Sequence, residues 1–211
     1  MKLYTYFRSS AAFRVRIALN LKGIAYQPEF VHLARGEHRA PGYGAVNRQA
    51  LVPTLDDSGK LLTQSLAIIE YLDETHPAIP LLPKDAPGRA RVRSLAMLIA
   101  CEIHPLNNLR VLQHLKRALA KNDDQVNDWY RHWIADGLTR FEADLAKAAG
   151  RFCHGDAPTM ADCCLVPQIF NAQRYQCDLA AYPNSMRVFA KCMKLDPFDR
   201  AQPSKQPDAE K

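Results

Sequence analysis

The chain has 211 residues, of which 47% are hydrophobic, and carries a formal net charge of +6. This length can bury a sizeable core, and two domains are expected. Lys and Arg are scattered among acidic residues with no basic cluster that also holds aromatics, so nucleic acid is not expected as a partner. No apolar run approaches the ~18 residues of a membrane span, and the first residues do not resemble a signal peptide. A soluble, cytoplasmic protein without membrane contacts is expected.

All six cysteines lie at or after residue 101, and no two of them form a Cys-x-x-Cys pair. Without a secretory context they are expected to be reduced and mostly structural. The Cys and His residues fall at no ligand-like spacing, so no metal site is expected.

The segment from Lys2 to Leu21 is the most informative stretch. KLYTYF has the aromatic and β-branched character of a strand, and Phe13, Ile17 and Leu21 then recur at helical spacing. A helix N-terminus favours an anion, because its dipole and its unpaired N–H groups point outward. In a thioredoxin-like fold a Cys-x-x-Cys pair would lie here. The four positions read Ser9, Ser10, Ala11 and Ala12. This serine cluster is therefore either only a helix cap or part of a site whose reactive sulfur comes from a bound molecule.

The next elements complete a β-α-β and a β-β-α unit. Gly23 ends the helix, and residues 26–33 alternate like a strand. Residues 34–50 are polar and glycine-containing, and predict a ligand-facing flap with a short helix. Residues 51–55 and 60–62 predict two strands around a tight turn, with Pro53 after Val52 as a candidate cis peptide.

A second helix N-terminus is predicted at residues 63–72, with Ser65 at the cap position. Gln64 and the hydroxyl and N–H of Ser65 could receive a carboxylate. The alternative is that Ser65 only caps the helix and Gln64 lies on the surface.

Residues 76–90 are rich in proline and predict a linker. The remainder is expected to be helical. We expect helices at 91–119, kinked near His104-Pro105, at 127–149, after the capping box of Thr159 and Asp162, and at 183–194. The polar tail AQPSKQPDAEK is expected to be frayed.

This order of elements resembles the soluble glutathione transferases. Four segments, FRSSAAFRVRIALNLKGI, VPTL, QSLAIIEYLDETHP and HPLNNLRVL, together resemble the zeta class, the family of maleylacetoacetate and maleylpyruvate isomerases, over residues 1–195. The resemblance implies an α/β thioredoxin-like glutathione-binding domain at 1–80, a linker at 81–90 and an all-α domain at 91–211 with the substrate pocket and the polar tail. It also implies a homodimer.

One departure from the family pattern is that the usual Ser-Ser-Cys reads Ser9-Ser10-Ala11. The resemblance is therefore nearer to the bacterial maleylpyruvate isomerases, and no thiol of the chain itself can act there. Glutathione is the implied cofactor. Its implied ligands are Ser9, Ser10, Ala11, His38, Gln49, Val52, Pro53, Gln64, Ser65, His104 and Asn108.

The implied reaction is cis–trans isomerisation of a diacidic keto acid, with maleylpyruvate of the gentisate pathway as the favoured substrate. Alternatives are maleylacetoacetate in tyrosine catabolism, a conjugating transferase, or a non-catalytic interaction module. Guanidinium groups suit a diacid, because they bind carboxylates in a bidentate way. The expected catalytic residues are Ser9, Ser10, Arg8 and Arg110, and the expected substrate ligands are Arg8, Arg110, Arg174 and Asn107. Each of these arginines could instead be a solvated surface residue, whereas Arg14 and Arg16, inside the first helix, are expected to be structural.

Overall fold

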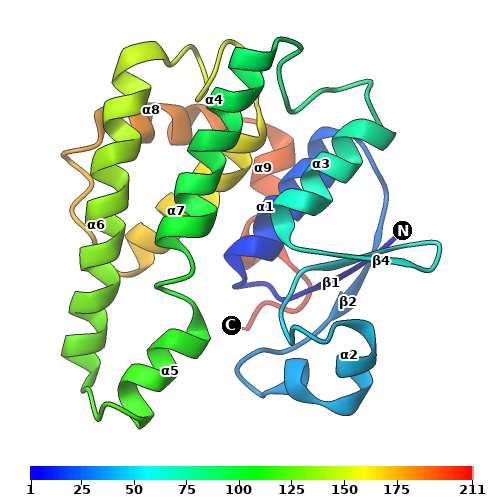
Figure 1. The fold of residues 1–211 in the computed structure, drawn as a ribbon, viewed down its shortest axis with the longest axis vertical. Helices are drawn as coiled ribbons and strands as arrows, with labels where there is room; N and C mark the ends of the chain where they lie inside the picture. The colour runs from blue at the N-terminus through cyan, green and yellow to red at the C-terminus, as the bar shows by residue number, and fades with distance from the viewer. Residues whose placement is uncertain (211) are drawn as a thin grey trace. The chain divides into compact units, whose positions relative to one another are not determined.

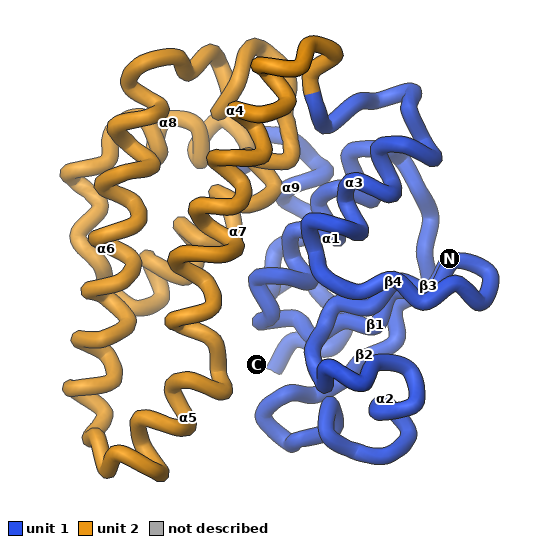
Figure 2. Tube along the Cα trace, viewed as in Figure 1, with its two compact units in different colours: residues 1–82, 193–211 blue, residues 83–192 orange. Residues whose placement is uncertain are grey.

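The computed structural model describes residues 1–210, and the chain forms two compact units (Figure 2). The first unit joins Met1–Leu82 to the segment from Met193 onward, and the second is Pro83–Cys192. The split falls inside the proline-rich stretch, as its composition suggests.

The first unit contains one four-stranded sheet in the order β2-β1-β3-β4. β1 is parallel to β2 and antiparallel to β3, which in turn is antiparallel to β4. The strands are β1 (Lys2–Thr5), β2 (Gln27–Phe30), β3 (Thr54–Asp57) and β4 (Lys60–Thr63). The helices are α1 (Ser10–Leu21), α2 (Pro41–Val46), α3 (Ser65–Thr75) and α9 (Asp196–Arg200). The β-α-β and β-β-α units of the thioredoxin-like plan are thereby confirmed.

Helices α1 and α3 lie on one side of this sheet and α2 lies on the other (Figure 1). Leu3 and Leu55 pair across β1 and β3 and are fully buried. Phe13 and Ile17 of α1 are buried as well, which is what their four-residue spacing predicts. Burial of these side chains stabilises the unit, at about 1.5–3 kcal/mol for each large apolar group.

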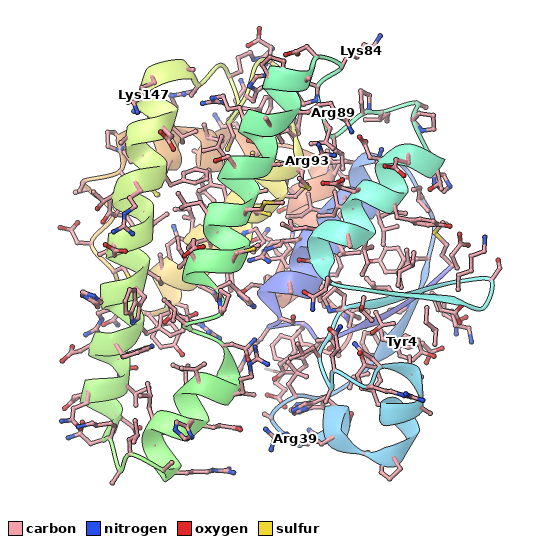
Figure 3. The ribbon with its side chains drawn as sticks, in the orientation of Figure 1. Tyr4, Arg39, Lys84, Arg89, Arg93 and Lys147 are labelled. Atoms are coloured by element: carbon pink, nitrogen blue, oxygen red, sulfur yellow. The ribbon has the colours of Figure 1, made fainter. Side chains whose placement is uncertain are left out.

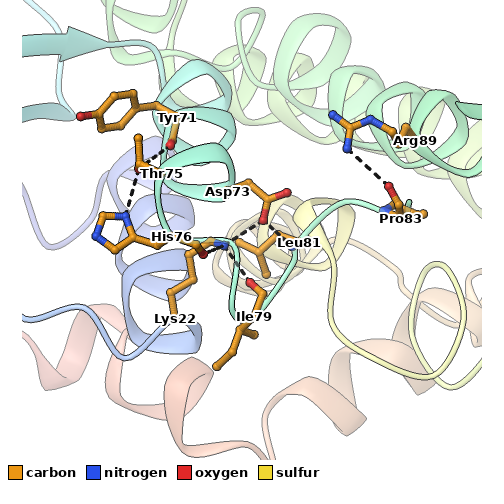
Figure 4. Close-up of polar contacts among 9 residues, drawn as sticks. All are labelled: Lys22, Tyr71, Asp73, Thr75, His76, Ile79, Leu81, Pro83 and Arg89. Atoms are coloured by element: carbon orange, nitrogen blue, oxygen red, sulfur yellow. Dashed lines mark hydrogen bonds and ion pairs between the residues drawn. The ribbon is translucent and has the colours of Figure 1, made fainter. Parts of the chain in front are cut away.

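The end of α1 is tied to the end of α3 by a buried ion pair (Figure 4). Lys22 Nζ lies 2.8 Å from Asp73 Oδ1, and the two side chains are only 1% and 10% exposed. Lys22 also donates to the carbonyl oxygens of His76 and Ile79, and Asp73 accepts from the N–H of Leu81. These bonds fix the first half of the proline-rich stretch, which contains no helix or strand of its own.

The regular secondary structure of the second unit consists of helices. Its helices are α4 (Ala86–Met97), α5 (Leu109–Arg117), α6 (Asp123–Ala148), α7 (Met160–Arg174) and α8 (Pro183–Cys192). A π-helical turn, Leu98–Ile103, extends α4. The capping box predicted at the start of α7 is confirmed, because Asp162 accepts from the N–H of Thr159 and its other carboxylate oxygen from that of Cys153.

The helix boundaries on either side of the π-helical turn differ from the expectation. The linker was expected to extend to residue 90, but α4 begins at Ala86, because Asp85 caps it by accepting from the N–H of Gly88 at 2.7 Å. Pro87 suits the first turn, where its missing N–H costs nothing. The expected kinked helix at 91–119 is in fact two helices, α4 and α5, separated by the π-helical turn and a short turn around Pro105.

The C-terminal segment also differs from the expectation of a frayed end on the helical domain. It belongs to the first unit, where α9 packs against α1. The guanidinium of Arg16 donates to the carbonyl of Ala201 at 3.0 and 3.1 Å, and the N–H of Phe7 donates to Asp208 at 2.9 Å. Specific polar contacts therefore order this segment as far as Glu210, whereas Lys211, the last residue of the predicted tail, lies outside the described residues.

Basic side chains come from many separate elements, as the scattered charge in the sequence suggests. Figure 3 labels Arg39 at the end of the 3₁₀ turn Glu37–Arg39, Lys84 before α4, Arg89 and Arg93 on α4, and Lys147 near the end of α6. Within residues 1–210, no helix is long and apolar enough to cross a membrane.

Candidate glutathione and diacid site

The first predicted anion position is the N-terminus of α1, where Ser9 is the N-cap. Its Oγ accepts from the N–H of Ala12 at 3.2 Å. This bond uses an oxygen lone pair, so the hydroxyl proton remains available to a second, negatively charged partner. The cap and the functional interpretation are thus compatible. Ser10 and Ala11 follow in the first turn of α1, where N–H groups have no intrahelical acceptor.

The second predicted anion position is the N-terminus of α3, and here one expectation was wrong. The N-cap is Gln64, and Ser65 is the first helical residue instead of the cap. Gln64 has φ 69° and ψ 117°, a conformation that non-glycine residues rarely adopt. Such strain persists where the surroundings enforce it, and it is concentrated at functional sites. Ser65 is only 6% exposed, which leaves its N–H and hydroxyl in a largely desolvated position.

Side chains from two loops meet at this second N-terminus. Gln64 Nε2 donates to Gln49 Oε1 at 2.8 Å, which joins the flap to the start of α3. Arg14 Nη1 donates to Ser65 Oγ at 3.2 Å from the neighbouring helix. Arg14 and Arg16 are both buried, in line with the expectation that they are not solvated surface residues.

The loop before β3 holds the predicted cis peptide, and Val52-Pro53 is indeed cis. Val52 is buried in an apolar cluster with Tyr6, Phe7 and Tyr43. His38 lies on the 3₁₀ turn Glu37–Arg39 and is 8% exposed. Burial lowers the pKa of its imidazole, with a smaller contribution from the charge of Arg39. The structure therefore places His38 just before α2 as a neutral donor or acceptor.

Arg8 lies between β1 and Ser9, and its guanidinium is half exposed. It lies 4.9 Å from the ring centre of Phe7, and its Nη2 is 3.9 Å from a carboxylate oxygen of Glu210. A separation of 3.9 Å is a weak ion pair, so most of the five guanidinium N–H donors remain available.

In the second unit, predicted residues follow the π-helical turn. His104 comes directly after it, and π-helical turns are frequent at functional sites. Asn108 caps α5 by accepting from the N–H of Arg110 at 3.2 Å, and the side chain of Arg110 is exposed. Asn107 donates to the carbonyl of Tyr130 at 3.2 Å, and its buried Oδ1 has no hydrogen-bond partner among residues 1–210.

Arg174 lies at the C-terminal end of α7, 4.9 Å from the ring centre of Tyr175. Tyr175 stacks on Tyr130 with ring centres 3.6 Å apart. Burial raises the pKa of Tyr130, and the charge of Arg174 and a hydrogen bond from it act in the opposite direction. Arg174 and Asn107 therefore both contact Tyr130, which links two predicted substrate residues within this unit.

Sequence reasoning missed three residues around Arg8 and Phe7, namely His32, Asp208 and Glu210. His32 Nε2 lies 2.8 Å from Glu210 Oε1, and Asp208 accepts from the N–H of Phe7. The acidic pair near the end of the tail was the available signal, but its partners lie about 200 positions away.

None of the six cysteines is in a disulfide bond within residues 1–210, and four of them are buried. Burial raises the pKa of Cys153, Cys177 and Cys192, which makes them poor nucleophiles. Among residues 1–210, no group of three His, Cys, Asp or Glu side chains is arranged to hold a metal ion. A nucleophilic sulfur at Ser9 would have to come from a bound molecule.

Comparison with known proteins gives this arrangement a family. Residues 1–74 match the family model of the glutathione S-transferase N-terminal domain. A maleylpyruvate isomerase from Ralstonia sp is 48% identical over 99% of this chain and 100% of its own length. The holo structure of a bacterial zeta-class maleylpyruvate isomerase matches all of both chains with a TM-score of 0.98 and 48% identity. The maleylacetoacetate isomerase of Methylobacterium extorquens AM1, solved with malonate and glutathione, matches all of both chains with a TM-score of 0.97 and 43% identity. The chain therefore belongs to the zeta class of glutathione transferases, the family that contains the maleylpyruvate and maleylacetoacetate isomerases.

Proposed function

We propose that this protein catalyses the glutathione-dependent cis–trans isomerisation of maleylpyruvate to fumarylpyruvate. The observation that carries the proposal is the pair of helix N-termini in the first unit. One presents Ser9 without any cysteine beside it, and the other presents the strained Gln64 with buried Ser65. This donor set suits a ligand that carries both a thiol and a carboxylate.

The residues present fit glutathione. Ser65 already accepts a hydrogen bond from Arg14, so its hydroxyl proton and its N–H can both donate to the γ-glutamyl carboxylate. Gln64, held by Gln49, adds an amide beside that carboxylate. Val52 offers main-chain polar groups to the cysteinyl part, with His38 as a further candidate ligand. In the second unit, His104 and Asn108 are candidate ligands as well.

Ser9 would activate the sulfur. A thiol with an ordinary pKa of about 8.5 is only a few per cent ionised at pH 7. Lowering that pKa by about two units requires roughly 2.7 kcal/mol of preferential thiolate stabilisation. The hydroxyl proton of Ser9, the N–H groups of Ser10 and Ala11 and the dipole of α1 together supply interactions of this size.

When bound, glutathione supplies the thiolate that adds to the cis double bond, permits rotation and is expelled to leave the trans isomer. The candidate carboxylate ligands are Arg8 in the first unit and Arg110 and Arg174 in the second unit, because a guanidinium binds a carboxylate and stabilises the additional charge that develops on the substrate's carbonyl oxygen. Asn107, beside Tyr130, would orient the keto-acid end. The malonate in the Methylobacterium relative is a dicarboxylate, which is consistent with a diacid substrate.

The deciding experiment is an ultraviolet assay of dialysed protein with maleylpyruvate and with maleylacetoacetate, each with and without glutathione. We expect no turnover without glutathione and a higher kcat/KM for maleylpyruvate. Preference for maleylacetoacetate would move the protein to the sister activity. Conjugation without isomerisation would make it an ordinary transferase, and an inert protein would favour an interaction module. Activity without any added thiol would overturn the mechanism in which glutathione supplies the sulfur.

We also propose that the protein is a cytoplasmic homodimer. Free thiols suit a reducing compartment. Leu61 and Met97 are large apolar side chains that are 44% and 45% exposed, and each unit thus offers an apolar group for a subunit interface. Sedimentation equilibrium should give twice the 23.8 kDa chain mass, whereas a single-chain mass would contradict the dimer.

A further inference from the structure

The C-terminal segment holds the loop that carries Arg8 and Ser9. The N–H of Phe7 donates to Asp208 Oδ2 at 2.9 Å, across 201 positions of sequence. Asp208 accordingly lies close to the residues that precede α1. Phe7 directly precedes Arg8, so Asp208 fixes the main chain one residue before the predicted substrate ligand.

The same peptide group is held from its other side by Arg16. The guanidinium of Arg16 donates to the carbonyl oxygens of Tyr6 and Phe7 at 3.3 and 3.1 Å, and to Thr5 Oγ1 at 3.1 Å. Burial lowers the pKa of Arg16 to about 10, while the charges of Tyr26 and Asp208 oppose this effect, so Arg16 remains a cation at pH 7. The end of β1 is thus held between a buried cation and a carboxylate from the tail.

Glu210 extends this contact to the side chain of Arg8. Glu210 Oε1 is 2.8 Å from His32 Nε2 and 3.5 Å from Arg35 Nη2, and Oε2 is 3.9 Å from Arg8 Nη2. His32 Nδ1 accepts from the N–H of Arg35 at 3.1 Å, so in the neutral ring the proton is on Nε2 and points to Glu210. The carboxylate of Glu210 is therefore held mainly by His32. Its weaker contact with Arg8 orients the guanidinium but leaves most of the guanidinium donors available.

Between the two acidic residues, Ala209 packs on the apolar cluster that contains Phe7, Val31 and Val52. The last residues of the described chain thus make a charged, an apolar and a second charged contact in sequence. All three contacts fall on the β1–α1 loop or on the residues packed beside it.

We propose that Asp208 and Glu210 are positioning residues of the isomerase site: they preset Phe7 and Arg8 so that the Arg8 guanidinium receives a carboxylate of the substrate next to Ser9. This inference rests on the proposed function. Because Glu210 contacts Arg8 only at 3.9 Å, an incoming carboxylate can take over its donors while His32 keeps Glu210 in place. The effect is on substrate binding, not on sulfur activation.

The test compares Glu210→Gln, Asp208→Ala and Asp208→Asn in the full chain with wild type. Glu210→Gln and Asp208→Ala should each raise KM for maleylpyruvate three- to tenfold, with kcat and glutathione affinity within about twofold of wild type. Asp208→Asn keeps an acceptor for the N–H of Phe7 and should restore KM to within about twofold. Asp196→Asn is the matched control, because it removes one charge from the same segment at a carboxylate that pairs with Arg200 at the surface, and it should behave as wild type.

A second readout separates this inference from the proposed function. Malonate should bind the glutathione-loaded protein in calorimetry, and its dissociation constant should rise three- to tenfold in Glu210→Gln and Asp208→Ala. If wild type binds malonate but does not isomerise maleylpyruvate, the proposed function fails. The malonate dissociation constants of the variants still test whether Asp208 and Glu210 position Arg8. If both variants lose thermal stability yet keep wild-type KM and malonate affinity, the tail is only structural and the inference is overturned.

Discussion

Arg14 of α1 donates a hydrogen bond of 3.2 Å to the hydroxyl of Ser65, the first residue of α3. A buried cation in one helix thereby orients the residue that is expected to hold the γ-glutamyl carboxylate at the start of the other. This contact explains why a charged residue stands among the apolar positions of α1, where an aliphatic side chain would be buried without the cost of desolvating a charge.

The first prediction is that Arg14 acts on glutathione through Ser65. Ser65→Ala and Arg14→Met should each weaken glutathione binding, by about tenfold for a loss near 1.5 kcal/mol. The double variant should be little worse than Ser65→Ala, because both changes remove the same interaction. Calorimetry on the four proteins measures this coupling. Fully additive losses would show that Arg14 acts elsewhere, and melting curves control for general loss of stability.

The second prediction concerns Ser9, which both caps α1 and is expected to stabilise the thiolate. Ser9→Ala should lower turnover by about 10- to 1000-fold if the hydroxyl acts like one anion-hole donor. It should also cost about 1 kcal/mol of stability through the lost cap bond to the N–H of Ala12. Ser9→Gly separates the loss of thiolate stabilisation from the loss of the cap, because glycine at an N-cap costs only a few tenths of a kcal/mol of stability.

The measurement for Ser9 is the thiolate absorbance of the glutathione complex as a function of pH. Both variants should raise the pKa of bound glutathione by a similar amount, although only Ser9→Ala loses much helix stability. An unchanged thiolate titration in both would assign activation to Ser10 or to the main chain.

The local parts of this site could be predicted from the sequence. The change from strand to helical period around Ser9, the hydroxyl at Ser65 and the capping box at Asp162 all depend on residues within a few positions of each other. The start of α4 also had a local signal in Asp85 and Pro87. The proline-rich composition of the stretch led to a linker prediction in spite of that signal.

The long-range parts could not be predicted. Polar composition favours a frayed tail, but Asp208 and Glu210 find partners in Phe7, His32 and Arg8, and nothing local encodes such pairs. The one-residue shift at Ser65 has a similar cause, since the Gln49 contact and the strained backbone of Gln64 depend on a separate loop. Helix boundaries follow from tertiary contacts as well as from capping residues.

The third prediction is that the Lys22–Asp73 pair is a large local contribution to stability. Lys22→Met leaves a buried carboxylate with one partner fewer and should cost about 3–5 kcal/mol. Lys116→Met is the matched control, because its partner Asp123 and Lys116 itself are well exposed, and the change should cost under about 1 kcal/mol. Urea unfolding of both variants measures the difference, and equal losses would contradict the prediction.

The fourth prediction is a pH dependence that arises from Glu210. The hydrogen bond from His32 and the charges of His32, Arg8 and Arg35 lower the pKa of Glu210 below its ordinary 4.5, against a smaller effect of desolvation. Glu37 and Asp208 are the nearby acids, bound to the N–H groups of His32 and Phe7. The unfolded chain therefore binds this proton at higher pH than the folded chain. The stabilising contribution is complete above about pH 4.5 and is lost as the pH falls through the lowered folded pKa.

Urea midpoints of wild type and Glu210→Gln should accordingly differ by a constant amount above about pH 5.5 and converge in more acidic solution. A difference that grows on acidification would reverse the sign and remove Glu210 as the group responsible.

The last prediction concerns the three candidate substrate arginines. The guanidinium of Arg8 has only a long contact to Glu210, the side chain of Arg110 is exposed, and that of Arg174 lies over the ring of Tyr175. Each of these guanidinium groups is a cation with N–H donors that can bind a carboxylate of a diacid. If a charged hydrogen-bond pair is worth about 1.5–3 kcal/mol, each Arg→Ala change should lower kcat/KM by roughly one to two orders of magnitude. Arg→Lys should recover little where the carboxylate is bound by two parallel bonds.

Glutathione affinity of the same variants, measured by calorimetry, should change by less than about threefold. Arg117→Ala, on the same helix as Arg110 but in its last turn, is the matched control and should keep wild-type kinetics. Within residues 1–210, Arg8 is the one of the three whose guanidinium contacts the C-terminal segment, so only its loss should abolish the effect of Glu210→Gln on KM. A large loss of glutathione binding with intact substrate kinetics would instead reassign the arginine concerned to the cofactor.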